Sequence, residues 1–151
     1  KMFGARAIVT SSSDEKLARA KELGADALIN YKTTPDWEKP ARELSGGLGV
    51  DHIIEVGGAG TLGKSLKCIR IGGVIHVIGV LSGVAPSDFS VIPILMQNVR
   101  LQGVLVGSRD VFEQMNKAIA LHQMRPVVDR VFPFDPARQA FFFEGQLRLA
   151  R

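Results

Sequence analysis

The chain has 151 residues, of which 46% are hydrophobic and 16 are glycines, so it is long enough for one domain with a hydrophobic core and many tight turns. Its net charge of +4 suits an anionic ligand, but the lysines and arginines are scattered, which argues against a nucleic-acid-binding surface. The single cysteine excludes an internal disulfide, and no apolar run approaches the roughly 18 residues of a membrane-spanning helix.

The first predicted element is a strand at Ala7–Val9, a wholly apolar run typical of a strand buried in a parallel sheet. A polar turn at Ser11–Ser13 follows. Ser12 and Glu15 have the spacing of a capping box, which predicts the start of a helix. Gly24 fits the left-handed end of that helix. Three apolar residues share one face of the helix: Leu17, Ala20 and Leu23.

The same alternation continues along the chain. Further strands are predicted at residues 27–31, 50–56, 74–80 and 99–106. Helices are predicted at residues 37–44, 62–69 (closed by Gly72-Gly73), 91–96 and 108–119 (capped by Ser108, with Phe112, Met115 and Ile119 buried), and from Asp135-Pro136 through Phe141–Phe143. Residues 126–134 are expected to be extended. Strands that alternate with helices at this spacing indicate an α/β fold with a parallel sheet.

The serine turn is the first candidate site. In a dinucleotide-binding fold the end of the second strand meets the adenosine ribose, where an acid would bind the 2′-hydroxyl. Ser11 stands at about that position, with Lys16 one turn further on. Hydroxyls and a cation can bind a 2′-phosphate, and no carboxylate is expected where it would repel one. The alternative is that these serines only cap a helix, which is a common role.

A second candidate is the sequence from Gly58 to Gly63, which matches G-x-G-x-x-G after a strand and before a helix. As a pyrophosphate cradle it lacks a supporting acid at the end of the next strand. The favoured interpretation is therefore a loop that lines the ligand crevice at the carboxyl end of a strand. The pyrophosphate cradle stays open as the alternative.

No catalytic or metal-binding residue is predicted. The histidines lack zinc-ligand spacing and are expected to be structural: His52, His76 and His122. Cys68 lies on a predicted helix and is expected to be inert. Asp51 and Glu55 share a strand without a neighbouring base or nucleophile, so catalysis by paired acids is not favoured.

Several segments, taken in order, resemble the medium-chain dehydrogenase/reductase superfamily, which includes zinc-type alcohol dehydrogenases and quinone oxidoreductases. These segments are residues 10–17, 20–26, 29–31, 49–51, 55–58, 72–79, 106–109 and 131–135. The resemblance implies that residues 1–151 are a partial NAD(P)-binding, Rossmann-like, doubly wound parallel sheet. The first strand and glycine-rich loop of that fold are not in this sequence. Residues 126–151 would form a tail that packs toward an absent catalytic domain.

In the usual strand order, the absent strand lies between the strands at Ala7 and Val50. Its absence would leave two sheet edges unpaired. Each buried hydrogen bond left unmade would cost about 1–3 kcal/mol of folding free energy. We therefore expect that these two strands do not pair directly. We also expect that a further segment of the protein, or another chain, fills the gap.

The resemblance also assigns cofactor-binding positions. Those expected at the adenosine 2′-phosphate are Ser11, Ser12, Ser13, Lys16 and Tyr31, although Tyr31 has the alternative role of covering the sheet edge. Those expected along the adenosine side of the crevice are Gly57 and Gly58. Those expected near the nicotinamide are Gly79, Val80, Val106, Gly107 and Ser108.

The function implied by the resemblance is that of an NADPH-dependent oxidoreductase, with NAD as the other possible cofactor. It would transfer hydride between the nicotinamide and a small carbonyl, alcohol, quinone or enoyl substrate. Zinc, if used, would be held by residues outside this chain, which alone is expected to be inactive. The complete protein is expected to be a cytoplasmic homo-oligomer, a dimer or tetramer, without nucleic-acid or membrane partners. The alternative is a non-catalytic nucleotide-binding or structural module, with RNA binding a distant third.

Overall fold

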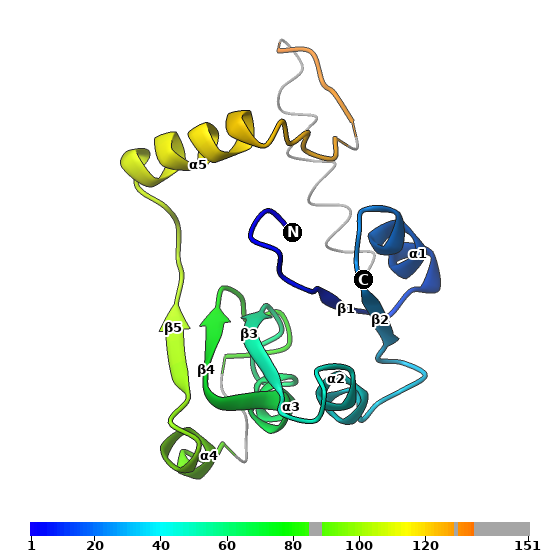
Figure 1. The fold of residues 1–151 in the computed structure, drawn as a ribbon, viewed down its shortest axis with the longest axis vertical. Coiled ribbons are helices and arrows are strands. Elements are labelled where there is room, and N and C mark those ends of the chain that lie inside the picture. Colours follow the sequence, from blue (N-terminus) through cyan, green and yellow to red (C-terminus); the bar gives the residue numbers. More distant parts are fainter. Residues whose placement is uncertain (85–88, 129, 135–151) are drawn as a thin grey trace. The chain divides into compact units, whose positions relative to one another are not determined.

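The computed structural model describes residues 1–84, 89–128 and 130–134, in which strands and helices alternate (Figure 1). The strands are β1 (Ile8–Ser11), β2 (Ala27–Asn30), β3 (Val50–Glu55), β4 (Ile69–Val77) and β5 (Arg100–Gly103). The helices are α1 (Asp14–Glu22), α2 (Glu38–Leu44), α3 (Leu62–Cys68), α4 (Ile92–Met96) and α5 (Arg109–Leu121). The chain divides into two compact units, Lys1–Val106 and Gly107–Arg151. The predicted α/β class is confirmed.

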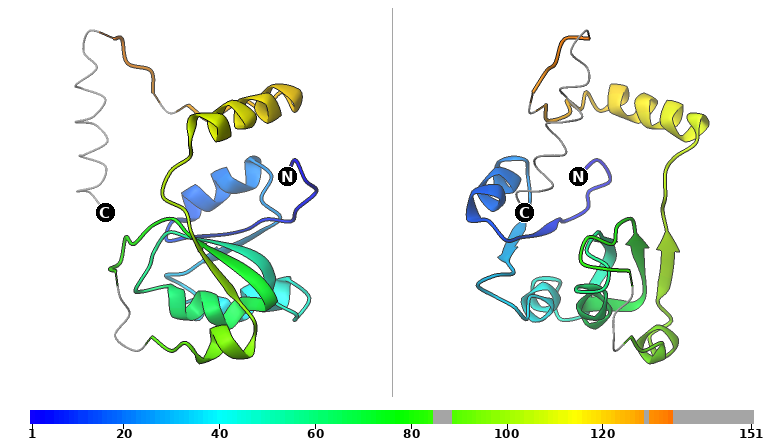
Figure 2. Two further views of the ribbon diagram at one scale, coloured as in Figure 1. Left: turned by 90° about the vertical axis from the view of Figure 1, so that its left-hand side faces the viewer. Right: turned by 180° about the vertical axis from the view of Figure 1, so that it is seen from behind.

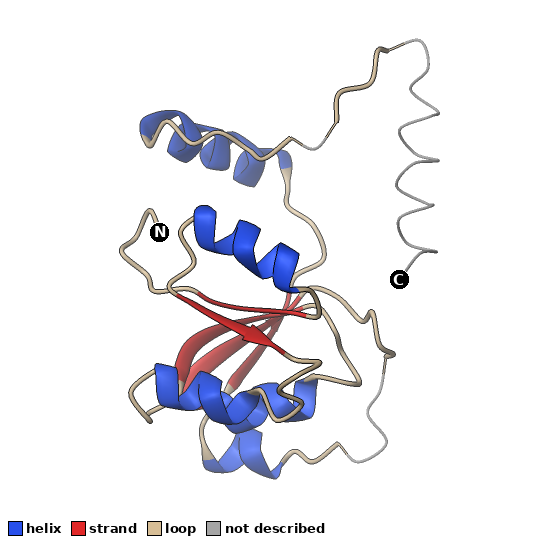
Figure 3. Ribbon diagram, turned by 90° about the vertical axis from the view of Figure 1, so that its right-hand side faces the viewer, coloured by secondary structure: helices blue, strands red, loops and turns tan. Residues whose placement is uncertain are grey.

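The first unit has helices on both sides of its strands. Figure 3 shows α1 on one side and α2, α3 and α4 on the other. The views in Figure 2 show α2 and α3 side by side beneath the strands. All strand pairs are parallel: β1 with β2, β3 with β4, and β4 with β5. This layering is that of a doubly wound sheet, as expected from the sequence.

The strands form two separate sheets, with the order β1-β2 in one and β3-β4-β5 in the other. β1 and β3 are not paired, which confirms the prediction for the strands at Ala7 and Val50. In the described part of the chain, each of them presents an open edge to the gap between the sheets.

The helical layer holds the two sheets together. A buried cluster of Ile29 from β2, Ala41 from α2 and Cys68 from α3 is packed by Ile8 from β1 and Val50 from β3. A second cluster lies under the larger sheet and consists of Leu66, Ile69, Ile75 and Val99. Because the first cluster draws on both sheets, side-chain packing fixes their separation without backbone hydrogen bonds between them.

The turn between β1 and α1 differs in detail from the expectation. β1 continues to Ser11, and the helix cap is Ser13, whose hydroxyl accepts the Lys16 amide at 3.3 Å. The predicted capping box of Ser12 and Glu15 is therefore wrong by one residue. Leu17 is buried as expected, whereas Leu23 forms the C-cap and is 56% exposed.

Two further expectations in the first unit are wrong. Ile8 and Val9 are only partly buried, because no strand covers the open edge of β1. The helix predicted over 62–69 ends at Cys68, and Ile69 starts β4 by pairing with Val50. Gly72 and the residue after it lie inside this strand instead of closing a helix. The complete burial of Ile69 in the core accounts for the early start of the strand.

The second unit contains α5, which is capped as predicted by the Ser108 hydroxyl, an acceptor for the Val111 amide at 3.3 Å. Phe112 and Met115 were expected to be buried, but they are 56% and 48% exposed, and α5 has no buried side chain. The described residues after His122 form neither helix nor strand. The predicted helix start at residues 135–136 and the phenylalanines at 141–143 lie outside the described residues.

Candidate cofactor-binding site

The structure brings the predicted 2′-phosphate residues of β1 and β2 to one sheet edge. Ser11 is the last residue of β1 and lies in register with Asn30 at the end of β2. The Ser11 carbonyl accepts the Tyr31 amide at 3.0 Å, so Tyr31 starts beside the serine turn. Lys16 lies in the first turn of α1, three residues after the cap Ser13. The carboxyl end of a parallel strand and the start of the next helix is where such folds bind anions.

The serine hydroxyls also have structural roles. The Ser13 oxygen caps α1, and the Ser11 oxygen accepts the Ser13 amide at 3.3 Å. The capping interpretation is therefore correct for Ser13. It does not exclude a phosphate contact, because a serine hydroxyl that accepts one hydrogen bond keeps its own proton to donate.

Two acids, Asp14 and Glu15, lie in the first turn of α1, although no carboxylate was expected where it would repel a phosphate. The Asp14 carboxylate accepts a hydrogen bond from the Asn30 side-chain amide at 2.7 Å. This bond ties the carboxylate to the end of β2. Asn30 is a residue that the sequence analysis did not single out, and the only signal for it was its place at the end of a strand.

The loops after β3 and β4 are joined to each other. The Ser82 amide and hydroxyl both donate to the Gly57 carbonyl at 2.7 Å, and the Ala59 amide donates to the Gly83 carbonyl at 2.9 Å. A Cβ at Gly58 would lie 2.5 Å from the Gly83 oxygen and 2.9 Å from the Val80 Cα. Gly57, Gly58 and Val80 therefore come together, at a contact that only glycine permits at position 58, although Val80 was expected near the nicotinamide and the two glycines on the adenosine side.

Gly79, just after β4, lies against the residue that follows β3, because a Cβ at Gly79 would be 2.7 Å from the Val56 carbonyl oxygen. The predicted residues of these two strand ends are thus adjacent. Val106 belongs to the first unit, whereas Gly107 and Ser108 belong to the second. A role for these last three residues at the nicotinamide stays a prediction.

The backbone amides of residues 57–62, at the G-x-G-x-x-G loop, all have hydrogen-bond partners within the chain. The Gly57 and Gly58 amides donate to the Glu55 carboxylate at 2.8 and 3.1 Å. The Ala59 amide donates to the Gly83 carbonyl, and the Gly60 amide donates to the Ser82 hydroxyl at 2.8 Å. The amides of residues 61 and 62 donate to the Gly58 carbonyl. This geometry contradicts the pyrophosphate-cradle alternative, since such a cradle requires unpaired N–H groups.

No metal site is found in the described ranges, where no group of three or more His, Cys, Asp or Glu side chains could hold an ion. His52 Nδ1 and His76 Nε2 are 3.1 Å apart and share a hydrogen bond across β3 and β4. Cys68 is buried, and desolvation raises the pKa of its thiol to about 11. A thiol with this pKa is protonated at neutral pH, which supports the predicted inertness.

Comparison with known proteins identifies the family. The family described as "Zinc-binding dehydrogenase" matches residues 1–121. The chain belongs to this family. The zinc-binding dehydrogenases are medium-chain enzymes, so the expected superfamily is confirmed.

Relatives of this zinc-binding dehydrogenase chain are similar over nearly its whole length. A zinc-type alcohol dehydrogenase-like protein of Schizosaccharomyces pombe is 45% identical over 93% of the chain and 42% of its own length. A solved NAD-dependent alcohol dehydrogenase is 31% identical, with a TM-score of 0.81 over 96% of the chain and 42% of its own. A solved 2-haloacrylate reductase is 30% identical, with a TM-score of 0.79 over 94% of the chain and 47% of its own.

The chain thus spans less than half the length of these relatives. The helices within the described residues include none that is both long and apolar enough to cross a membrane. A cytoplasmic location stays a prediction.

Proposed function

We propose that this chain is the dinucleotide-binding part of an NADPH-dependent oxidoreductase. The observation that carries the proposal is the end of β1, where Ser11 occupies the position at which an acid would select for NADH. When bound, the nicotinamide supplies the hydride exchanged with a carbonyl, alcohol, quinone or enoyl substrate. The residues of this chain bind and orient the cofactor.

Two features at the serine turn support NADPH over NADH, against the acids Asp14 and Glu15 of the same helix turn. Lys16 adds a cation beside the start of α1, and the helix N-terminus itself favours an anion. The bond from Asn30 to Asp14 satisfies one oxygen of the neighbouring carboxylate, which reduces its repulsion of a phosphate. NAD is the second candidate cofactor, because one solved neighbour is an NAD-dependent alcohol dehydrogenase.

Titration of the full-length protein with NADPH and NADH tests the cofactor preference. We expect NADPH to bind at least about tenfold more tightly, which is roughly 1.4 kcal/mol. Ser11→Ala and Lys16→Ala should each weaken NADPH binding and leave NADH binding nearly unchanged. Lys21→Ala, a lysine at the other end of α1, is the matched control. Equal wild-type affinities for the two cofactors would refute the role of Ser11 and Lys16.

The catalytic function would be that of the whole protein. The Schizosaccharomyces pombe relative is more than twice as long as this chain. A zinc ion, if the protein uses one, would be held by residues outside these 151. We also propose that the whole protein forms a homo-oligomer. The competing proposal is a nucleotide-binding module without catalysis. NADPH oxidation in the presence of a panel of aldehydes, quinones and activated alkenes separates the two, since a non-catalytic module would bind NADPH without oxidising it.

A further inference from the structure

Glu55, the last residue of β3, carries a buried carboxylate that is only 3% exposed and has four hydrogen-bond donors around it. Its Oε1 accepts the Gly57 amide at 2.8 Å, the Gly58 amide at 3.1 Å and the Thr61 hydroxyl at 2.5 Å. Its Oε2 accepts the Ser65 hydroxyl at 2.5 Å. Both carboxylate oxygens are therefore hydrogen-bonded, and three of the four donors converge on Oε1. Burial without such partners would be strongly unfavourable.

These hydrogen bonds determine the shape of the glycine loop. Two consecutive amides that converge on one carboxylate oxygen fix the direction of the chain after β3. At this turn Gly58 has a φ of +80°, which disfavours any residue with a side chain. The Thr61 hydroxyl reaches the same oxygen from the start of α3, so Glu55 ties the strand, the turn and the helix together.

The same bonds determine which chemistry the loop offers to a ligand. The Gly57 carbonyl accepts from Ser82, and the Gly58 carbonyl accepts the amides of residues 61 and 62. With both amides on Glu55 and both carbonyls occupied, the peptide groups of this turn have no vacant donor for an anion. Gly58 is buried against Val80 and Gly83, whereas Gly57 is only half-buried. The part of the turn that is open to a ligand is therefore Gly57, which suits the flat face of a base or a sugar ring better than a phosphate.

We infer that Glu55 is a positioning residue: it holds the Gly57–Gly58 turn so that Gly57 forms an uncharged contact surface for the nucleoside part of the cofactor. The inference rests on the proposed function, because it assumes that a dinucleotide lies along these strand ends. It goes beyond that proposal by assigning a role to a buried acid. Since the contact concerns the nucleoside and not the 2′-phosphate, the loss of Glu55 should weaken NADPH and NADH binding equally.

The test compares Glu55→Gln with Asp51→Asn in the full-length protein. Asp51 is an exposed carboxylate on the same strand, bonded to Arg70 at 2.6 Å. The dissociation constants of NADPH and NADH are measured together with the hydrogen-exchange rates of the Gly57 and Gly58 amides. We expect Glu55→Gln to speed this exchange and to raise both dissociation constants about tenfold, the size expected when a charge-assisted hydrogen bond is lost. Asp51→Asn should change neither quantity.

Faster exchange in Glu55→Gln with unchanged cofactor affinity would show that the carboxylate serves stability alone, which overturns the inference. If Glu55→Gln does not fold, Thr61→Val decides the question, because it removes one donor to Oε1 and keeps the shape of the side chain. An affinity of Thr61→Val equal to that of the wild type would then overturn the inference. A wild-type protein that binds neither cofactor refutes the proposed function itself, which is a distinct result.

Discussion

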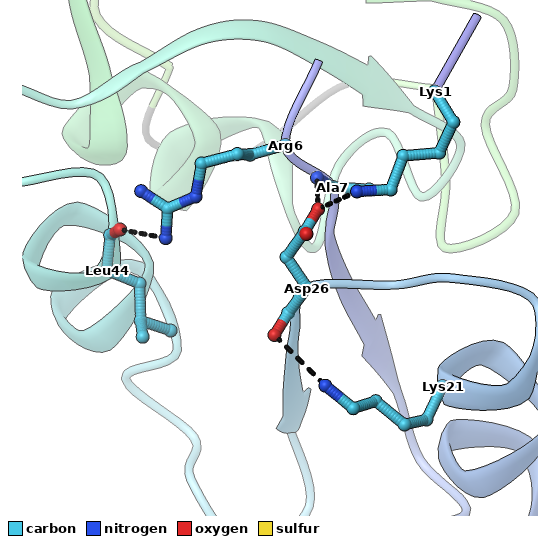
Figure 4. Close-up of polar contacts among 6 residues, drawn as sticks. All are labelled: Lys1, Arg6, Ala7, Lys21, Asp26 and Leu44. Carbon is cyan, nitrogen blue, oxygen red and sulfur yellow. Dashed lines mark hydrogen bonds and ion pairs between the residues drawn. The ribbon is translucent and has the colours of Figure 1, made fainter. Parts of the chain in front are cut away.

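Asp26 lies just before β2, and its carboxylate fixes the start of the smaller sheet. Its Oδ2 accepts the Ala7 amide at 2.6 Å and also binds the Lys1 ammonium group (Figure 4). The Asp26 backbone amide donates in turn to the Ala7 carbonyl at 2.9 Å. The hydrogen bond from Lys1 and then that from Ala7 lower the pKa of the Asp26 carboxyl from its usual value of 3.8. The charged form of Asp26 is thus favoured by the folded state.

We predict that Asp26→Asn lowers the thermal midpoint near neutral pH and that the difference from wild type shrinks in acid. A carboxyl with a lowered folded-state pKa stabilises the protein above its unfolded pKa, and this contribution is lost as the pH falls through the folded value. Thermal unfolding monitored by circular dichroism between about pH 7 and pH 2 measures the effect.

Asp36→Asn is the matched control for this prediction. Hydrogen bonding to Lys39 also lowers the pKa of Asp36, but this acid is bonded to the exposed Lys39 side chain instead of a backbone amide. Exposed ion pairs contribute little, so the midpoint of this variant should change less. A difference between Asp26→Asn and wild type that persists unchanged at low pH would contradict the role given to the charge.

At the scale of an element, the start of α1 depends on one of three adjacent serines. Ser13 has the extended backbone of an N-cap, with φ −129° and ψ 125°, and its hydroxyl accepts a hydrogen bond from the Lys16 amide. A helix start leaves amides without intrahelical partners, and the cap satisfies one of them. The capping-box spacing predicted Ser12 as the cap, but Ser12 lies one residue before the observed cap Ser13.

We predict that Ser13→Ala destabilises the protein by about 1 kcal/mol, the usual contribution of an N-cap. Ser12→Ala, which removes the same atoms one position earlier, should be nearly neutral. Urea unfolding of both variants gives the two free energies. A larger loss for Ser12→Ala than for Ser13→Ala would show that the helix begins one residue earlier than in this structure.

The boundary between α3 and β4 shows why glycines alone do not predict correctly where a helix ends and a strand begins. Gly72-Gly73 indicated a break after a helix, yet both lie inside β4. A Cβ at Gly73 would be 2.5 Å from the Ile69 Cγ1, so the small residue makes room for that side chain. Gly73 thus serves packing within a strand, whereas Gly72, with a φ of +70°, lies where the register between β3 and β4 is irregular.

At the scale of the whole molecule, the open position between β1 and β3 is the dominant feature. Two parallel sheets share one helical layer and one buried cluster, yet no hydrogen bond joins their facing edges in the described residues. Unpaired strand edges are an aggregation hazard that proteins normally cover. A strand supplied from outside these residues would pair with both edges and complete a continuous sheet.

We predict that such a strand fills the gap in the full-length protein. The amides of β1 and β3 that point into the gap should then exchange at least about tenfold more slowly than in the isolated 151-residue chain, because exchange requires opening of the paired structure. Hydrogen-exchange mass spectrometry on both proteins measures this difference. Direct pairing of β1 with β3, seen as protection of both edges in the isolated chain, would contradict the prediction.

The sequence by itself determined the alternation of strands and helices, the parallel pairing, the cap at Ser108 and the absence of direct pairing between β1 and β3. These features follow from local apolar runs, turn residues and a superfamily resemblance, all of which are encoded over short stretches. Only the tertiary structure decided that the amides of residues 57–62 are occupied, that Glu55 is buried beneath this loop, and that Ser13 caps α1. These depend on atoms brought together across loops and turns, and sequence spacing does not specify which donor meets which acceptor.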